Sequence, residues 1–235
     1  LDWISNEVSQ FIVLEDDCIP SLDFFEFAID SFAQLKRNSN ATLFCGSQFV
    51  PVGLTNNSAY LSKYTLTWGW GTTSINWKML RNKILFDAER DRCFEQVPRF
   101  ERNYWRAGAR RAVDGYSDVW DTLVSVALLQ HNLRAILPGS NLVVNVGNDA
   151  FATHTVGSDQ LHKRDFGYYL KAAKIIENPQ ADLWLRENVF KIRKRHSITT
   201  RVTHLLDLIG LHSKKVENLK VRWLFEDDSN CLVSD

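Results

Sequence analysis

Residues 11–21 read FIVLEDDCIPS and carry the strongest structural signal in the chain. Four successive apolar residues, 11–14, run into Glu15-Asp16-Asp17, which predicts a short buried strand with a charged carboxyl end. Ser21 is a favourable N-cap residue, and the apolar residues after it recur at helical spacing, so a helix is predicted to follow. In α/β proteins, ligands bind at the carboxyl ends of such strands.

Other segments extend this pattern. Short apolar runs beside glycine or polar residues predict three more strands, at residues 42–45, 134–137 and 142–146. Residues 123–128 carry the apolar stripe of a helix, for which Ser117 or Asp118 can serve as the N-cap. We therefore predict an α/β protein with a mixed sheet flanked by helices.

The composition limits the class of function. The chain has 235 residues, 45% of them hydrophobic and 12% aromatic, which is enough for one main core. Lys plus Arg and Asp plus Glu both number 28, so a net charge of zero gives no global field that would favour nucleic acid as a partner. The four cysteines form no C-x-x-C pair, which argues against a zinc ribbon, a thioredoxin motif or a disulfide scaffold.

The composition changes near residue 159, where mixed charged and apolar stretches begin. We predict a domain at 1–158 and a helical appendage at 159–235. The basic run at 191–201, beside the leucine-rich residues 205–211, could dock on anionic lipid or could form a solvated helix face. Because no apolar run reaches the roughly 20 residues that span a bilayer, the expected location is cytoplasmic, with peripheral contact at the inner face of the membrane as the alternative.

The three acids suggest a bound cation. On an extended backbone Glu15 and Asp17 point one way and Asp16 the other, so two carboxylates can share one ligand. Acids placed behind a buried strand repel one another and are desolvated unless a cation or a donor compensates them. Mg²⁺ or Mn²⁺ would do so. Solvated acids, or acids that cap the next helix, are the simpler alternative.

Several motifs in one order resemble a known family. Residues 14–25, LEDDCIPSLDFF, resemble the metal-binding segment of glycosyltransferases with the GT-A fold, in particular bacterial sugar-nucleotide transferases with a Glu-Asp-Asp motif, and that of N-acetylglucosaminyltransferase I. The likeness continues through residues 68–71 (WGWG), 120–121 (WD), 141–147 (NLVVNVG) and 152–155 (ATHT).

This resemblance implies a GT-A fold and transfer of a sugar, with inversion, from a nucleotide-diphosphate donor, most simply a UDP-sugar, to a hydroxyl of a glycan or lipid-linked glycan acceptor. It implies that Asp17 binds the Mn²⁺ or Mg²⁺ that holds the diphosphate, with Glu15 and Asp16 near the ribose and the metal-bound waters. In the family, βα units that bind the base precede the acids. Only fourteen residues do so here, so about 60 to 90 residues are expected to be absent, at roughly 30 residues per βαβ unit.

Transfer with inversion needs a base that removes the proton of the acceptor hydroxyl. Asp121 follows Trp120 as the base of the family follows its tryptophan, and is therefore the first candidate, with Asp118 the second. Both acids lie where a helix is predicted to begin, and carboxylates in a first helical turn commonly cap free N–H groups. Capping remains open as the role of either residue.

Four more residues complete the expected site. His154, between two threonines, is expected to contact the metal or the diphosphate, although a lone histidine is often structural. One of Trp68 and Trp70 is expected to line the donor pocket, and core packing is the alternative for each. Gly69, between them, would let the backbone approach the donor.

Two rival functions stay open. A metal-dependent phosphohydrolase would use the same acids to activate water. A non-catalytic module would bind glycans through its tryptophans. Products distinguish the first rival, because transfer releases UDP whereas hydrolysis of a phosphate ester releases inorganic phosphate.

Overall fold

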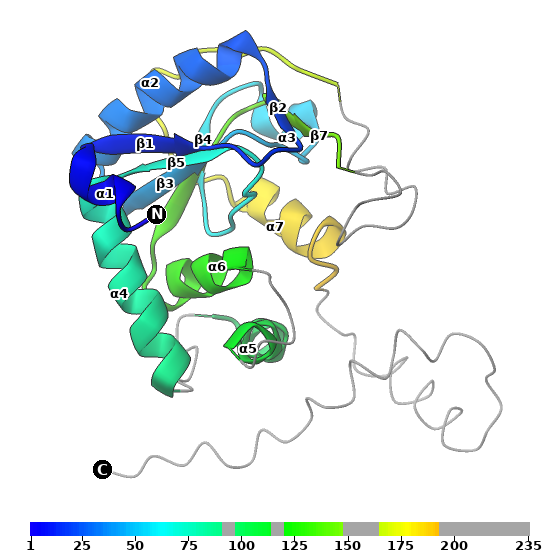
Figure 1. Ribbon diagram of the computed structural model, residues 1–235. Helices are drawn as coiled ribbons and strands as arrows, with labels where there is room; N and C mark the ends of the chain where they lie inside the picture. The colour runs from blue at the N-terminus through cyan, green and yellow to red at the C-terminus, as the bar shows by residue number, and fades with distance from the viewer. Residues whose placement is uncertain (91–96, 114–119, 148–164, 193–235) are drawn as a thin grey trace, which may run out of the picture.

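The computed structural model describes residues 1–90, 97–113, 120–147 and 165–192, with the side chains of residues 85–90 left aside. It is a mixed α/β structure in which helices lie on both faces of a sheet (Figure 1). This agrees with the predicted fold class. Within these ranges, no helix combines the length and the apolarity needed to cross a bilayer.

The main sheet has five strands in the order β1-β5-β3-β6-β4. Their bounds are Gln10–Val13 (β1), Trp70–Thr73 (β5), Ala41–Cys45 (β3), Arg134–Leu137 (β6) and Tyr60–Ser62 (β4). β3 and β6 are parallel, and the other neighbouring pairs are antiparallel. A second sheet has only β2 (Cys18–Pro20) and β7 (Val143–Asn145), which run antiparallel.

Helices cover the two faces unequally. α2 (Leu22–Arg37) lies alone above the sheet in Figure 1, while α4 (Ser74–Arg90), α5 (Arg99–Val113) and α6 (Trp120–Gln130) lie below it. The remaining helices are α1 (Ile4–Glu7), α3 (Val52–Thr55) and α7 (Pro179–Asn188). The helix layer below the sheet therefore faces the larger of two hydrophobic clusters.

β3 separates the two clusters because its side chains alternate between the faces of the sheet. Leu43 and Cys45 belong to the cluster shared with α6, and Phe44 to the cluster shared with α2. The Phe44 ring is fully buried and meets the Phe27 and Phe32 rings edge to face, with centroids 5.7 and 5.0 Å apart. Such aromatic contacts set the distance between α2 and the sheet.

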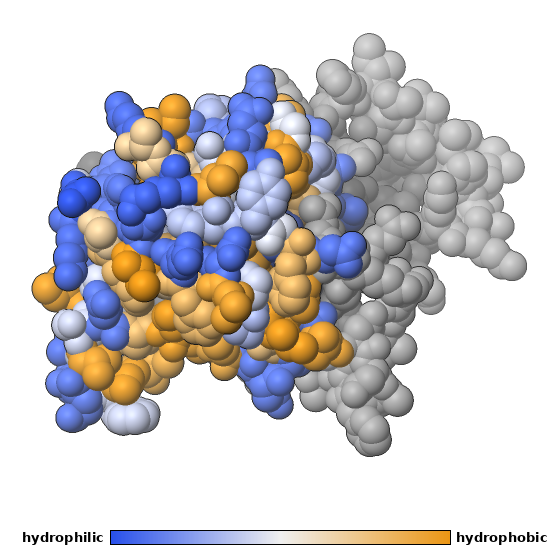
Figure 2. All heavy atoms as spheres, turned by 90° about the horizontal axis from the view of Figure 1, so that it is seen from above, coloured by the Kyte–Doolittle hydropathy of each residue, from blue (hydrophilic) through white to orange (hydrophobic). Residues whose placement is uncertain are grey.

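α2 also has an outward apolar stripe. Leu22, Phe25 and Ile29 are 86%, 44% and 70% exposed. Figure 2 views the molecule from the α2 side and shows hydrophobic side chains scattered among hydrophilic ones on that face. The helix is therefore apolar around more of its circumference than burial against the sheet requires.

The predicted segments agree with the structure in most cases. The strands predicted at 42–45 and 134–137 are β3 and β6, and the segment 11–14 is β1 shifted by one residue. Ser21 is the N-cap of α2, with extended backbone, but its hydroxyl makes no hydrogen bond among the described residues. The strand predicted at 142–146 is β7, which pairs with β2 outside the main sheet.

The chain after residue 158 is described only at 165–192. There, Ala181 and Leu185 of α7 are buried in the larger cluster, and the Tyr169 hydroxyl donates to Asp30 Oδ2 of α2 at 3.0 Å. This part of the predicted appendage thus contacts the sheet domain directly. The basic run predicted to meet lipid lies almost entirely outside the described residues.

Candidate active site

The acidic segment lies in the turn between β1 and β2. β2 pairs with β7, and the Val146 N–H donates to the Asp17 carbonyl oxygen at 2.8 Å, which extends this pairing to the acids. The backbone of Asp17 is thus fixed by a strand from a distant part of the sequence. Turns between strands tolerate charged residues because their side chains reach solvent.

Three side chains converge at this turn. One ligand atom each from Glu15, Asp17 and Cys18 lie within 4.8 Å of one another. Glu15 is exposed, Asp17 is half-buried and Cys18 is buried, whereas the exposed Asp16 is not in this group. This matches the expectation that Glu15 and Asp17 share one side of the segment.

The donor atoms of the turn suit a hard cation. Partial burial, with the Asp17 charge as the next cause, raises the pKa of Glu15. The same two causes, in the same order, raise the pKa of the Cys18 thiol to about 12. Two carboxylates with water and phosphate oxygens are a donor set that Mg²⁺ and Mn²⁺ accept, so the residues fit the implied ion.

Gly147 lies directly against the Asp17 side chain. A Cβ atom at residue 147 would collide with Asp17 Oδ2, while the Gly147 N–H donates to Asn145 Oδ1 at 2.8 Å. Only glycine therefore leaves space for the Asp17 carboxylate in this position.

We expect Gly147→Ala to displace the Asp17 carboxylate and to weaken Mn²⁺ binding by about 10- to 100-fold, the usual effect of disturbing a ligand through its surroundings. Electron paramagnetic resonance of free Mn²⁺ during titration measures this. Gly53→Ala is the matched control, because no atom lies within 4 Å of a Cβ atom at residue 53. Equal Mn²⁺ affinity in the two variants would contradict the role assigned to Gly147.

Asp121 lies in the first turn of α6, close to the acidic turn. Its charge helps to raise the pKa of Glu15, whereas the Trp120 side chain nearby acts in the opposite direction. The Trp120 ring packs against the buried Trp70 ring, with ring centroids 5.4 Å apart. The WD pair therefore lies at the start of α6 beside the acidic turn, with its tryptophan packed on Trp70.

The Asp121 carboxylate is poorly solvated. Thr67 Oγ1 donates a long 3.4 Å bond to Oδ2, whereas the buried Oδ1 has no hydrogen-bond partner among the described residues. Burial raises the pKa of Asp121, although nearby donors of Thr122 and Thr67 act in the opposite direction. An under-solvated carboxylate with a raised pKa is a common form of catalytic base.

The two tryptophans of the WGWG motif differ in environment. Trp70 is 1% exposed and packs in the core against Phe11 and Trp77, so its ring offers no face to a ligand. Trp68 is half-buried and meets Phe49 edge to face at 5.2 Å. Burial thus leaves Trp68 as the member of the pair that could line a donor pocket.

Gly69 has a structural reason to be glycine. Its φ of +61° lies in the left-handed region, and a Cβ atom there would approach Val143 Cγ2 to 2.8 Å. Its carbonyl accepts from the Gly46 N–H at 2.6 Å. The hydrogen bond ties Gly69 to the residue that follows β3, and Val143 of β7 leaves no space beside it for a side chain.

Two predicted site residues, Asp118 and His154, lie outside the described residues. The structure therefore assigns neither a position. Of the carboxylates expected in the site, it brings Glu15 and Asp17 together, with Asp121 near enough to influence the pKa of Glu15.

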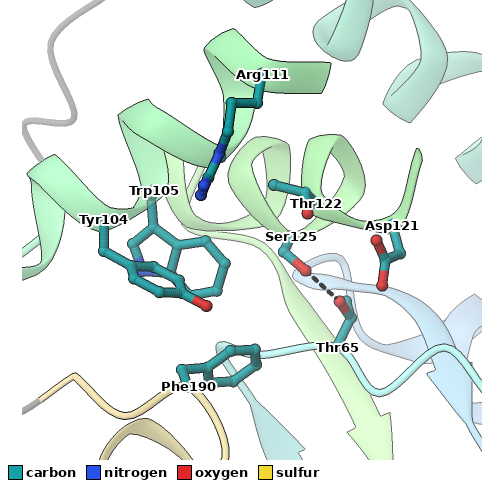
Figure 3. A pocket seen from close by; sticks show the side chains of 9 residues that line it. Thr65, Tyr104, Trp105, Arg111, Asp121, Thr122, Ser125 and Phe190 are labelled. Atoms are coloured by element: carbon teal, nitrogen blue, oxygen red, sulfur yellow. Dashed lines mark hydrogen bonds between the residues drawn. The ribbon is translucent and has the colours of Figure 1, made fainter. Parts of the chain in front are cut away.

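Sequence reasoning missed a cavity of about 250 Å³ beside Asp121 (Figure 3). Its lining residues come from α5, α6, the segment before β5 and the segment after α7: Thr65, Tyr104, Trp105, Gly108, Arg111, Asp121, Thr122, Ser125 and Phe190. The amphipathic spacing of 99–113 could have predicted a helix, but nothing in the spacing indicates that Tyr104 and Arg111 line a cavity with Asp121.

A scan against protein-family models and a search of curated protein sequences both found no match to this chain.

Proposed function

We propose that the protein is a metal-dependent glycosyltransferase of GT-A type. It would transfer a sugar, with inversion, from a nucleotide-diphosphate donor such as a UDP-sugar to a hydroxyl of a glycan. The observation that carries the proposal is the position of Asp121. Its carboxylate is close enough to influence Glu15 in the acidic turn, and it also lines the 250 Å³ cavity. Transfer to a hydroxyl requires a base that lies between the donor-binding region and the acceptor-binding region.

The donor side of the site is the acidic turn. Asp17 and Glu15 would hold Mn²⁺ or Mg²⁺, which when bound neutralises charge on the diphosphate. Asp16 is exposed beside them and can reach a ribose or a metal-bound water. Val146 and Gly147 fix the backbone and the carboxylate of Asp17, so the chain provides a preformed site for the donor.

The acceptor side of the site begins at Asp121. The proton of the acceptor hydroxyl passes to the Asp121 carboxylate, and the acceptor oxygen forms a bond to the anomeric carbon. The bond from that carbon to the diphosphate breaks, and its electron pair leaves with the diphosphate. The raised pKa makes Asp121 a stronger base than an exposed aspartate, which favours this proton transfer.

The test is product analysis. We expect incubation with UDP-glucose or UDP-N-acetylglucosamine and a glycan acceptor to release UDP and to glycosylate the acceptor only when Mn²⁺ or Mg²⁺ is present, and EDTA to stop both. Chromatography of the nucleotides and a phosphate assay measure the products. Release of inorganic phosphate would instead indicate a phosphohydrolase, and binding of glycans without any turnover would indicate a non-catalytic module.

A further inference from the structure

The cavity beside Asp121 has the size of a single sugar unit. At about 250 Å³ it is smaller than the roughly 300 to 1,000 Å³ sites of drug-sized ligands. Figure 3 shows α5 side chains on one side of it and Asp121, Thr122 and Ser125 of α6 on the other. A ligand of this size would have one edge next to the Asp121 carboxylate.

One wall of the cavity is aromatic. Trp105 is 2% exposed, and its ring lies 5.0 Å from both Tyr104 and Phe190, centroid to centroid. Tyr104 is 43% exposed, so part of its ring is accessible. Aromatic side chains offer an apolar surface with a polar end, and such a wall suits the C–H face of a pyranose ring.

The polar atoms near this wall are only partly paired. Asp121 Oδ1 and Trp105 Nε1 are both buried and have no hydrogen-bond partner in the part of the chain that the structure describes. Thr65 and Ser125 instead share a short hydrogen bond between their hydroxyls. Buried polar atoms without partners are uncommon in folded proteins, so the polar groups of this wall are not paired as those of an ordinary core are.

Arg111 gives the cavity a positive charge. It lies in the last turn of α5, and in Figure 3 its side chain extends from the helix toward the Trp105 ring. Its charge is close enough to oppose the rise in the pKa of Tyr104 that burial causes. A guanidinium at a sugar-sized cavity matches a carboxylate or phosphate group, which it can bind with two parallel hydrogen bonds.

We propose that this cavity is the acceptor subsite and that the acceptor is an anionic sugar. Its charged group would lie on Arg111, its ring against Tyr104, and its reactive hydroxyl at Asp121. The assignment of the cavity to an acceptor rests on the proposed function. The charge preference rests on Arg111 and is tested by binding alone.

The test compares methyl β-D-glucuronide, glucose 6-phosphate and methyl β-D-glucoside by saturation-transfer NMR and by quenching of tryptophan fluorescence. We expect at least one of the two anionic sugars to bind about tenfold more tightly than the neutral glucoside. A preference for the glucuronide would indicate a uronic acid acceptor, and a preference for glucose 6-phosphate a phosphorylated one.

Arg111→Gln should remove this preference and leave the affinity for the neutral glucoside unchanged. Arg110→Gln is the matched control, since Arg110 is the adjacent exposed arginine of α5 and does not line the cavity. Thermal unfolding checks both variants. If Arg111→Gln unfolds, Arg111→Lys keeps the charge and should retain part of the preference.

Equal affinity for charged and neutral sugars in the unaltered protein would overturn the inference, as would the same loss of preference in Arg110→Gln. Failure of the proposed function would give a different result, namely no metal-dependent turnover of UDP-sugars despite selective binding of the anionic sugar.

Discussion

Replacing Asp121 with asparagine will lower the rate of sugar transfer by about 10²- to 10⁴-fold, the usual contribution of a general base. The same substitution will raise the melting temperature by about 2 to 4 °C, the shift that roughly 1 kcal/mol causes in a chain of this size. Activity falls because the amide cannot take the acceptor proton. Stability rises because an under-solvated charge, with Oδ1 unpaired among the described residues, is replaced by a neutral group.

The gain in stability depends on pH in a defined direction. Burial raises the pKa of Asp121 above its ordinary value of 3.8, so the folded protein holds this proton more tightly than the unfolded chain. The resulting stabilisation is complete below pH 3.8 and is lost as the pH rises through the folded pKa. The advantage of Asp121→Asn should therefore be present at neutral pH and disappear in acid. Calorimetric melts over this pH range measure it.

Asp182→Asn is the contrasting variant. Asp182 is also buried and burial also raises its pKa, but its carboxylate accepts from Ser62 Oγ at 2.6 Å and from the Lys63 N–H at 3.3 Å. An amide would lose one of these bonds, so we expect stability to fall by about 1 to 3 kcal/mol. If Asp121→Asn were destabilising as well, with activity retained, Asp121 would be a helix cap and not a base.

Replacing Asp17 with asparagine is expected to weaken Mn²⁺ binding by at least about 100-fold, since the change removes a ligand outright, whereas changes around a ligand cost 10- to 100-fold. Metal-dependent release of UDP should fall with it. Isothermal titration with Mn²⁺, alone and in the presence of UDP, measures the loss. Without metal, the variant should fold normally, because removing the Asp17 charge relieves its repulsion of Glu15.

Glu26→Gln provides the control for Asp17→Asn, because Glu26 is an exposed acid of the neighbouring helix α2. It removes the same charge from a side chain that is not among the converging ligand atoms. Unchanged Mn²⁺ affinity in Asp17→Asn, or an equal loss in Glu26→Gln, would contradict a metal role for Asp17.

The sequence predicted those helices and strands that a local pattern defines, such as a short apolar run or a residue that favours an N-cap. Buried runs such as 42–45 and 134–137 became β3 and β6, and Ser21 marks the start of α2. The pairing of strands was not predictable in this way. β5 begins at Trp70 in an aromatic, glycine-rich stretch, where Gly71 is required because a Cβ atom would collide with the Phe44 ring on β3. That requirement comes from tertiary packing and leaves no periodic pattern.

In the candidate site, too, some features follow from the local sequence and others depend on tertiary packing. Alternation along an extended backbone predicted that Glu15 and Asp17 share a side. The structure places their ligand atoms together, but in a turn between β1 and β2 and not in a strand. The resemblance selected Asp121, and the structure places it near Glu15. The cavity could not be predicted, since its lining combines Tyr104 of α5, Asp121 of α6 and Phe190 after α7. Contacts among residues so distant in sequence depend on the packing of three elements.

The hydrogen bond from Val146 to Asp17 has a consequence for the order of folding. The two residues are far apart in the chain, and closing a long loop costs entropy before any contact repays it. Helices such as α2 involve only neighbouring residues and can form early, whereas the ribbon of β2 and β7 must wait until β7 reaches the acids. A partly folded chain would therefore hold most of its helices while lacking the geometry that gathers its carboxylates, so affinity for a divalent ion should be among the last properties to develop during refolding.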